Sequence, residues 1–371
     1  MTTLLLLAVL SVAFANGAND NFKGVATLLG CGKAGYGRAL GYATLATLAG
    51  SAAALLLGGA LARSFSGKGL VPDPLTSDRH FLIAVAGAAA LTVLLATRLG
   101  MPVSTTHALV GGLTGAGLAA AGSAVRWGAV AKTLIYPLLL SPFIAVLLAL
   151  LLHPLFRCTR RWLGVEKETC LCFGSTVEAV DIEPGGAAVL RSTGLALTVG
   201  ELSSCRSRYP GAVLGTSVQW ALDRLHFLSA GAVSGARGLN DTPKIVALLI
   251  AAAPLLASAW SYAVVALVIA IGGLIGARRV AKTMSHRITG MNEDQAFSAN
   301  LATALLVTTA SGLGMPVSTT HVSVGAIFGI GLVSGQARWV SIVQIFLAWV
   351  TTMPVAGVLA AALYLALARL A

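Results

Sequence analysis

The sequence predicts an all-α polytopic membrane protein with two inverted-topology repeats, broken helices or re-entrant hairpins, and a small β-containing cytoplasmic insert. Three observations lead to this fold class. Of the 371 residues, 57% are hydrophobic and only 10% are charged, which is more apolar surface than a soluble core absorbs. The octet GMPVSTTH occurs twice, and a second polar motif recurs ahead of each copy. Repetition of this kind indicates two halves that share one fold.

Ten apolar stretches make up the membrane part of this prediction. A helix needs about 20 predominantly apolar residues to cross a hydrocarbon layer of about 30 Å. In the first half we expect such spans near residues 4–30, 39–62, 81–97, 99–121 and 127–155. In the second half we expect them near residues 227–256, 262–281, 296–312, 313–333 and 339–370. Five crossings per half is an odd number, which inverts the second half relative to the first.

Two motifs indicate that the halves are homologous. GMPVSTTH stands at residues 100–107 and again at 314–321, an offset of 214. ANGANDNFKGVATL at residues 15–28 precedes the first copy, and ARGLNDTPKIVALL at 236–249 precedes the second, an offset of 221. Two motifs in the same order at nearly the same offset are typical of a secondary transporter built by internal duplication.

The net charge of +12 bears on partners and on orientation. The basic residues lie in short loops without an interleaved aromatic patch, so we expect no nucleic-acid partner and instead attraction to the anionic lipid of the bilayer. Lys33 and Arg38 follow the first span, which predicts that this loop is cytoplasmic. We therefore expect a multi-pass protein of the cell inner (cytoplasmic) membrane, with its N- and C-termini outside.

Hydropathy falls in the middle of the chain, which predicts a division into a first transmembrane repeat at 1–156, a cytoplasmic insert at 157–210 and a second transmembrane repeat at 211–371. Within the insert, alternating apolar residues at 176–182 and 195–202 predict short strands. We expect an amphipathic helix at about 213–225 to lie along the membrane.

Four of the five cysteines fall in the central loop: Cys158, Cys170, Cys172 and Cys205. A zinc site needs tetrahedral ligands, and a C-x-C pair in a loop without histidine matches that pattern weakly. We expect reduced thiols, no structural metal and no cofactor. The role of the four cysteines stays open.

The first motif places charges inside apolar stretches, at Asp20, Lys23, Asp241 and Lys244. An ionised side chain at mid-membrane costs about 2.5–3.5 kcal/mol, so these groups must face partners or a water-filled cavity. The neighbouring glycines, Gly17 and Gly238, predict that the helix unwinds there and frees carbonyl oxygens.

Asn19 and Asn240 precede the two aspartates, and their oxygens complete an oxygen-rich site suited to a hard cation. Na⁺ at Asp20 and Asp241 is the only metal that the sequence leaves open. Each lysine follows its aspartate by three residues, which puts the pair on one face of a continuing helix.

The second motif favours an anion. Gly-Met-Pro resets the backbone and places proline in the first helical turn, so the residues that follow lie where backbone N–H groups have no partner within the helix. Those N–H groups, the helix dipole and the hydroxyls together suit a tetrahedral oxyanion gripped from both sides. The predicted substrate-binding residues are Ser104, Thr105, Thr106, Ser318, Thr319 and Thr320.

Histidine and arginine residues in or beside these motifs are further candidates for a function. His107 and His321 titrate in the relevant pH range and could shuttle protons, although a neutral histidine that fixes the hairpin is the plainer interpretation. Arg237 and Arg98 have no counterpart in the other half, where Asn16 and Gly312 stand. We expect Arg237 to contact the anion and Arg98 to anchor the membrane interface.

The GANDNFKG and LNDTPK segments, with the two VSTTH segments, resemble the inorganic phosphate transporter family usually called PiT. That family includes sodium-coupled and proton-coupled phosphate carriers and some sulfate permeases. The matching segments cover roughly a fifth of the chain. The resemblance implies an inverted-repeat fold that holds phosphate between the two Ser-Thr-Thr segments, with coupling cations near Asn19, Asp20, Asn240 and Asp241.

This chain departs from the family at one position in each half. Family motifs commonly read Gly-Ala-Asn-Asp-Val-Ala-Asn, whereas Lys23 and Lys244 stand here in place of the last asparagine. An ammonium group there would pair with the aspartate and take the place of a sodium ion. We hypothesise weaker sodium dependence than the family norm, with proton coupling through the aspartate–lysine pair as the alternative drive.

The sequence therefore predicts import of inorganic phosphate coupled to H⁺ or Na⁺, by a secondary active transporter and not an enzyme. Sulfate or a related oxyanion is the alternative substrate; phosphate is favoured because it keeps a proton near neutral pH, which Asp20 and Asp241 can accept. A membrane-embedded hydrolase is a rival class, but an active site is assembled once from unlike parts and every candidate here occurs twice. A passive anion channel and a homodimer also stay open.

Overall fold

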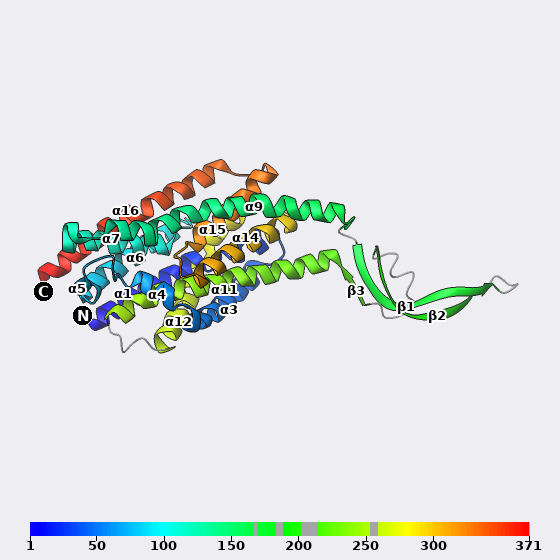
Figure 1. Cartoon of the computed structure of the whole chain (residues 1–371), viewed down its shortest axis with the longest axis horizontal. Coiled ribbons are helices and arrows are strands. Elements are labelled where there is room, and N and C mark those ends of the chain that lie inside the picture. The colour runs from blue at the N-terminus through cyan, green and yellow to red at the C-terminus, as the bar shows by residue number, and fades with distance from the viewer. Residues whose placement is uncertain (167–168, 183–187, 202–213, 253–258, 371) are drawn as a thin grey trace. The chain divides into compact units, whose positions relative to one another are not determined.

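The computed structural model describes residues 1–166, 169–182, 188–201, 214–252 and 259–370. The chain forms two compact units, and each is described by itself. One consists of Met1–His153 together with Phe227–Ala371, and the other of Pro154–His226. The first unit is helical and contains both copies of each motif (Figure 1).

Helices follow all the apolar stretches of the first half. Their bounds are α1 Thr2–Asp20, α2 Ala26–Gly30, α3 Tyr36–Leu57, α4 Gly59–Phe65, α5 Asp73–Thr76, α6 Arg79–Arg98, α7 Thr105–Ala121, η1 Gly122–Ala124, α8 Trp127–Val130, η2 Ala131–Ile135 and α9 Tyr136–Trp162. The second half contains α11 Val218–Ala252, α12 Ala259–Gly276, α13 Arg278–His286, α14 Glu293–Gly312, α15 Thr319–Ser334 and α16 Trp339–Leu370.

Six of the described helical segments are long and apolar enough to cross a membrane: Thr2–Asp20, Tyr36–Leu57, Arg79–Arg98, Trp127–Trp162, Ala259–Gly276 and Trp339–Leu370. The chain is thus a multi-pass membrane protein. Large apolar side chains remain exposed on it, such as Leu56 at 85% and Phe143 at 67%, as expected where lipid is the solvent.

The predicted spans 99–121 and 313–333 start too early, because residues 99–104 and 313–318 form loops. The helices that follow, α7 and α15, have only 17 and 16 residues, short of the roughly 20 that a crossing needs. Pro102 therefore lies in a loop and not in the first helical turn. The physical reason is the serine two residues later, whose hydroxyl caps the helix and sets its start.

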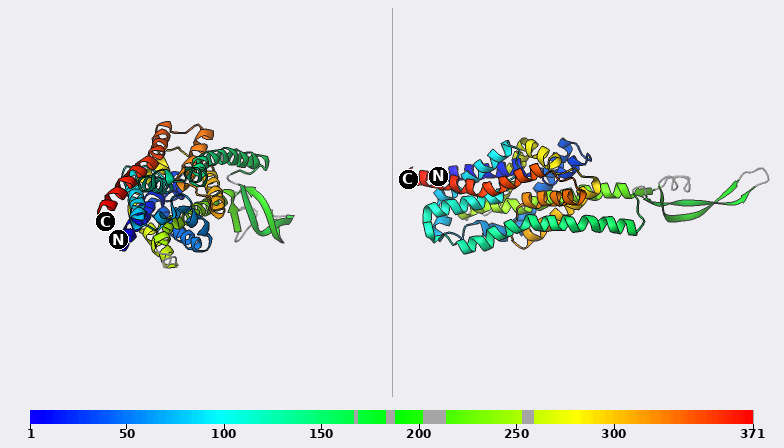
Figure 2. Two further views of the ribbon diagram at one scale, coloured as in Figure 1. Left: turned by 60° about the vertical axis from the view of Figure 1, so that its left-hand side comes forward. Right: turned by 90° about the horizontal axis from the view of Figure 1, so that it is seen from above.

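Repeat-equivalent helices run in opposite directions. In Figure 1, α9 leads away from the end at which α1 begins, and its equivalent α16 leads back to it. The helices α1 and α11 are opposed in the same way. As a result, α1 begins and α16 ends at the same end of the helical unit (Figure 2).

Glycines let helices of the two halves approach closely, which corrects the predicted unwinding at Gly17 and Gly238. Both residues are helical. A Cβ on Gly17 would lie 1.9 Å from the carbonyl oxygen of Ile269, and one on Gly238 would lie 2.2 Å from that of Thr47. Backbone contact explains these glycines, as it does in small-residue helix interfaces of membrane proteins.

The helix break instead follows the aspartate, and only in the first half. Helix α1 ends at Asp20, and residues 21–25 form turns before α2 begins. Helix α11 continues through Asn240–Lys244 with Pro243 inside it. The expectation of one continuing helix from aspartate to lysine is therefore right for the second half and wrong for the first.

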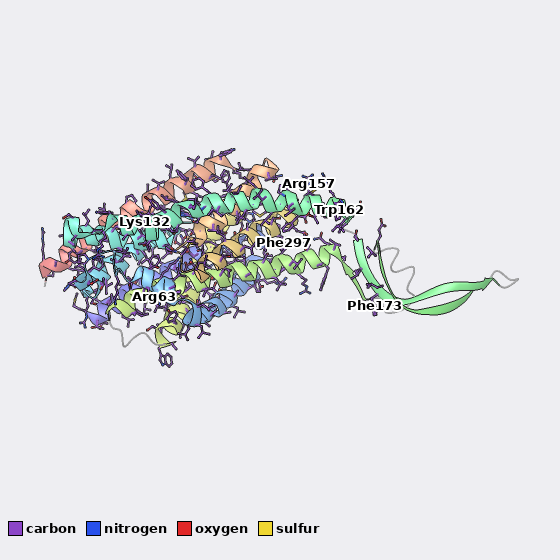
Figure 3. All side chains as sticks on the ribbon, in the orientation of Figure 1. Arg63, Lys132, Arg157, Trp162, Phe173 and Phe297 are labelled. Atoms are coloured by element: carbon purple, nitrogen blue, oxygen red, sulfur yellow. The ribbon has the colours of Figure 1, made fainter. Side chains whose placement is uncertain are left out.

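Buried apolar side chains form two groups within the helical unit. One gathers around α1, α6 and α7 and includes Val9 and Phe81. The other gathers around α2, α13 and α15 and includes Leu28 and Ile327. Side chains fill the space between the helices (Figure 3). Each group surrounds one hairpin that carries a GMPVSTTH motif.

The second unit contains an antiparallel sheet in the order β2-β1-β3, with β1 at Thr169–Ile182, β2 at Ala188–Glu201 and β3 at Leu214–Ser217. The predicted strands 176–182 and 195–202 are confirmed within β1 and β2, except that residue 202 lies outside the described residues. The first pairing runs from Thr169 opposite Glu201 to Ile182 opposite Ala188.

The predicted amphipathic helix at 213–225 is wrong at 214–217 and right in being helical from 218, while residue 213 lies outside the described residues. Leu214–Ser217 pairs with β1 as a strand, with Leu214 opposite Phe173. Residues from Val218 onward are the first turns of α11, which continues to Ala252. Cys205 and the side chain of Cys172 lie outside the described residues.

Candidate functional site

Two helical hairpins carry the GMPVSTTH motifs at their tips. Helices α6 and α7 form the first hairpin, and α14 and α15 form the second. Gly100 and Gly314 end the preceding helices with φ values of +72° and +68°, a conformation that favours glycine. The tip loops therefore have the same shape in both halves.

A serine caps the helix after each tip. The Ser104 hydroxyl accepts a hydrogen bond from the backbone N–H of His107 at 3.1 Å, and Ser318 accepts from His321 at 3.2 Å. These bonds use one of the N–H groups that a helix start leaves without a partner. The remaining N–H groups of each first turn point toward the tip loop, with the positive end of the helix dipole.

The two tips touch each other. The Thr320 hydroxyl donates to the carbonyl oxygen of Val103 at 2.7 Å, although the two residues are 217 positions apart. The rings of His107 and His321 lie edge to face with centroids 4.3 Å apart. Trp349 of α16 packs on His321 and donates to the carbonyl oxygen of Pro102 at 3.0 Å. One contiguous site results from two motifs that are distant in sequence.

Each lysine bonds to both tips, through a threonine hydroxyl of the opposite half and a backbone carbonyl of its own half. Lys23 donates to the hydroxyl of Thr320, and to the carbonyl of Val103 at 3.1 Å. Lys244 donates to the hydroxyl of Thr106 at 2.9 Å, and to the carbonyl of Val317 at 2.8 Å. The pattern is the same in both halves.

The same ammonium groups pair with the aspartates. Lys23 forms a buried ion pair with Asp20, and Lys244 lies 3.5 Å from Asp241. Both lysines are 1% exposed. Each ammonium is therefore shared between a carboxylate of its own half and a threonine hydroxyl of the other, as Lys23 shows with Asp20 and Thr320.

Asn19 and Asn240 form hydrogen bonds with the hairpins that carry the tips. Asn19 donates to the Thr97 hydroxyl at 2.9 Å and to the Met101 carbonyl at 3.0 Å, and its oxygen accepts from the Val103 N–H at 3.1 Å. Asn240 donates to the carbonyl of Val317 at 3.1 Å. Asn240 also donates to Oδ1 of Asp241 at 3.0 Å and accepts from the Ser311 hydroxyl at 3.2 Å. The role of the two asparagines as cation ligands stays a prediction.

Asn16 lies at the centre of the site and is not among the site residues that the sequence predicted. Its amide nitrogen lies 3.1 Å from Oδ2 of Asp20, 3.2 Å from Oδ2 of Asp241 and 3.1 Å from the hydroxyl of Thr105. The signal that could have found it was its place opposite Arg237 in the repeat alignment. Asn16 thus links the two carboxylates.

Arg237 is fully buried and contacts the first half. Its guanidinium donates to Asn16 at 2.8 Å, to Asn21 at 3.0 Å and to Thr47 at 3.1 Å. Its Nε lies 3.7 Å from Oδ2 of Asp241. The expected contact with an anion stays a prediction, and the contacts observed here are with protein oxygens. Arg98, by contrast, is exposed.

The predicted substrate-binding residues come together at the tips. All six are at most 4% exposed: Ser104, Thr105, Thr106, Ser318, Thr319 and Thr320. Two helix starts, their hydroxyls and two ammonium groups converge there, which is the chemistry that binds small oxyanions. Lys23, Lys244 and Arg237 outnumber the two carboxylates by one charge. Among the described residues no cluster of histidine, cysteine and acidic side chains could hold a metal ion.

Comparisons with known proteins agree with this chemistry. The model of a family described as the phosphate transporter family matches residues 16–360. The "Putative phosphate permease" of Pyrococcus abyssi is 29% identical over 97% of this chain and 96% of its own length. The "Probable low-affinity inorganic phosphate transporter" of Rhizobium meliloti is 30% identical over 81% of this chain and 78% of its own length.

One solved structure resembles the fold over its whole length. It carries the name "The sodium-dependent phosphate transporter", is 22% identical in sequence, and superposes with a TM-score of 0.75 over 100% of both chains. At this level of identity the likeness concerns the fold. The arrangement of both hairpins and the intervening helices is therefore one that a solved transporter also adopts.

Proposed function

This chain belongs to the phosphate transporter family, and we propose that it imports inorganic phosphate across the cytoplasmic membrane as a secondary active transporter coupled to a cation. It is a membrane phosphate transporter and not an enzyme, which removes the membrane-embedded hydrolase from consideration. We further propose two inverted repeats at 1–156 and 211–371 around an insert at 157–210, with both termini outside. The opposed directions of α9 and α16 support the inversion (Figure 1).

The contact of each lysine with the opposite hairpin carries this proposal. Lys244 bonds to Thr106, and Lys23 bonds to Thr320, so cationic groups of both halves meet hydroxyls of both halves at one place. A phosphate oxygen can replace a carboxylate oxygen at an ammonium group, because both are anionic acceptors. In this mechanism phosphate competes with Asp20 and Asp241 for the two lysines and takes the threonine hydroxyls as further donors.

The aspartate–lysine pairs also bear on the coupling ion. Each carboxylate has an ammonium partner of its own half, so no dissolved sodium ion is needed to balance it. A proton on the carboxylate would release the ammonium to phosphate, and loss of that proton after transport would restore the ion pair. We therefore propose proton coupling, with sodium as the alternative.

The substrate is proposed to be phosphate rather than sulfate. Hydroxyl and ammonium groups donate to either anion, but phosphate near neutral pH also carries a proton that needs an acceptor. The carboxylates of Asp20 and Asp241 lie among the donors and supply that acceptor. A sulfate permease is the second candidate, and substrate competition separates the two.

Uptake by purified protein in proteoliposomes tests the proposal. Labelled phosphate and sulfate are offered under separately imposed proton and sodium gradients, and counterflow is measured without a gradient. We expect phosphate to accumulate under an inward proton gradient and to exchange in counterflow. Accumulation that requires sodium and ignores the proton gradient would contradict proton coupling, and equal uptake of both anions would contradict phosphate selectivity.

A further inference from the structure

The symmetry of the site fails at one pair of positions. Lysine, aspartate and asparagine recur in both halves, as do the threonines at the tips. Asn16 and Arg237 occupy equivalent positions, yet one is neutral and the other cationic. These two residues contact each other, with the guanidinium of Arg237 2.8 Å from Oδ1 of Asn16. The extra positive charge therefore lies where the two halves meet.

Oxygen atoms from three separate segments surround this guanidinium. Oδ1 of Asn16 comes from α1, Oδ1 of Asn21 from the turns after it, and Oγ1 of Thr47 from α3. Oδ2 of Asp241 completes the set at 3.7 Å. Arg237 is 1% exposed, so protein groups surround its charge, and the carboxylate of Asp20 acts on that charge together with Asp241. Three neutral oxygens and one carboxylate oxygen thus surround one buried cation.

The equivalent place in the other half differs in its neutral oxygens. Gly17 and Gly238 are equivalent, and each packs against a backbone carbonyl of the other half: Gly17 against that of Ile269, and Gly238 against that of Thr47. Ile269 is therefore the counterpart of Thr47, and its side chain is apolar. Thr242 is the equivalent of Asn21, and its hydroxyl donates to Ser51 at 2.8 Å. The carboxylate therefore occurs on both sides, because Oδ2 of Asp20 lies 3.1 Å from the amide nitrogen of Asn16. The neutral oxygens differ, because the counterparts of Asn21 and Thr47 are Thr242, which bonds to Ser51, and an isoleucine.

Such an oxygen set resembles the surroundings that a hard metal cation takes in proteins. Amide, hydroxyl and carboxylate oxygens are the usual ligands of hard cations. We infer that the guanidinium of Arg237 is a tethered counter-cation, which fills an oxygen site suited to a sodium ion and makes a dissolved cation unnecessary beside Asp241. The consequence of this inference, transport that does not need sodium, rests on the proposed function; the inference about the oxygen site does not.

The geometry also separates this role from that of a substrate ligand. Both Nη atoms of Arg237 already donate to neutral side-chain oxygens, and its Nε faces Asp241. The tip hydroxyls bond instead to Lys23 and Lys244. Arg237 is thus a positioning residue that acts through Asp241 and Asn16.

Removing the guanidinium provides the test. The variant Arg237→Asn installs the residue that the first half has at this position and leaves the surrounding oxygens in place. We expect purified Arg237→Asn to bind ²²Na⁺, and to gain thermal stability in sodium chloride over choline chloride, because a ligand of the folded state stabilises it. Its phosphate uptake should fall at least tenfold without sodium and recover in part with it.

Three control variants test whether sodium binding by Arg237→Asn is specific. Arg237→Lys keeps a cation and should show no sodium binding, and Arg98→Asn, which removes an exposed arginine, should behave as the unmodified protein. Adding Thr47→Ile to Arg237→Asn installs the other half's residue and removes one oxygen. This double variant should lose the gained sodium binding.

Two results would overturn the inference. One is an Arg237→Asn protein that binds no sodium and is stabilised equally by sodium and choline salts. The other, which needs no variant and holds even if Arg237→Asn does not fold, is sodium-specific stabilisation or sodium-driven uptake by the unmodified protein. Absence of phosphate uptake by the unmodified protein would instead count against the proposed function, because sodium binding is read without transport.

Discussion

The two polar segments that precede the hairpins differ in backbone structure and yet make the same contacts. In the first half the helix ends at Asp20 and turns lead to Lys23, whereas in the second half α11 continues from Asp241 through Lys244. Both lysines nevertheless reach a carboxylate of their own half and a threonine of the other. A three-residue spacing allows this contact in either backbone, since residues three apart lie on one side of a helical turn.

The same comparison separates two parts of the site. The lysines, aspartates and tip threonines are equivalent in both halves, as expected for groups that hold one substrate between two repeats. Asn16 and Arg237 are equivalent in position but differ in charge, and both lie beside the carboxylates that the lysines pair with. We therefore propose that the duplicated part binds the substrate and that the unequal part determines the coupling ion.

The largest expected effect comes from removing one lysine. Lys23→Met or Lys244→Met leaves a buried carboxylate without its ammonium, which costs about 3–5 kcal/mol of stability. Phosphate uptake should be lost in both variants. Thermal unfolding in detergent and proteoliposome uptake measure the two effects.

Replacing the aspartate as well as the lysine allows the stability of the two halves to be compared. Asp20→Asn should restore the stability of Lys23→Met almost completely, because the unpaired charge is removed. Asp241→Asn should restore Lys244→Met only in part, because it leaves Arg237 without its carboxylate. Equal restoration in both halves would show that Arg237 does not depend on Asp241.

A smaller effect is expected from the glycines at the helix contacts. Gly17→Ala and Gly238→Ala place a Cβ against a carbonyl oxygen, at 1.9 Å and 2.2 Å before relaxation. Overpacking of this kind costs about 1–3 kcal/mol, and both variants should lose similar stability because the contact is the same in both halves. Thermal unfolding measures it. Gly41→Ala, which meets nothing within 4 Å, is the matched control and should lose none.

The smallest effect concerns the threonine hydroxyls. Thr106→Val and Thr320→Val each remove an acceptor of a lysine, worth about 1.5 kcal/mol, and should raise the half-saturating phosphate concentration about tenfold. Thr105→Val and Thr319→Val should raise it less. Initial uptake rates over a phosphate series measure these shifts. Unchanged half-saturation in all four variants would contradict the assignment of the hairpin tips as the anion site.

Much of the membrane architecture was predictable because its signals are local. The apolar stretches, the two motifs and their nearly constant offsets can be read directly from the sequence. The family and the helical fold that they predicted were both confirmed. The strands of the insert were predictable for the same reason, since alternation of side chains is a property of neighbours. The start of α7 was not, because capping by Ser104 competes with the helix-starting tendency of Pro102 and only the folded loop decides between them.

By itself, the sequence determined which residue types carry the chemistry, because an ionised or hydroxyl-rich segment in an apolar stretch is costly unless it has a partner. Only the tertiary structure decided what the partners are. Lys23 meets Thr320 across 297 positions, and Arg237 meets Asn16 across 221. Such contacts depend on how the hairpin tips and helices pack in space. The local sequence around each residue does not specify which distant side chain it will contact.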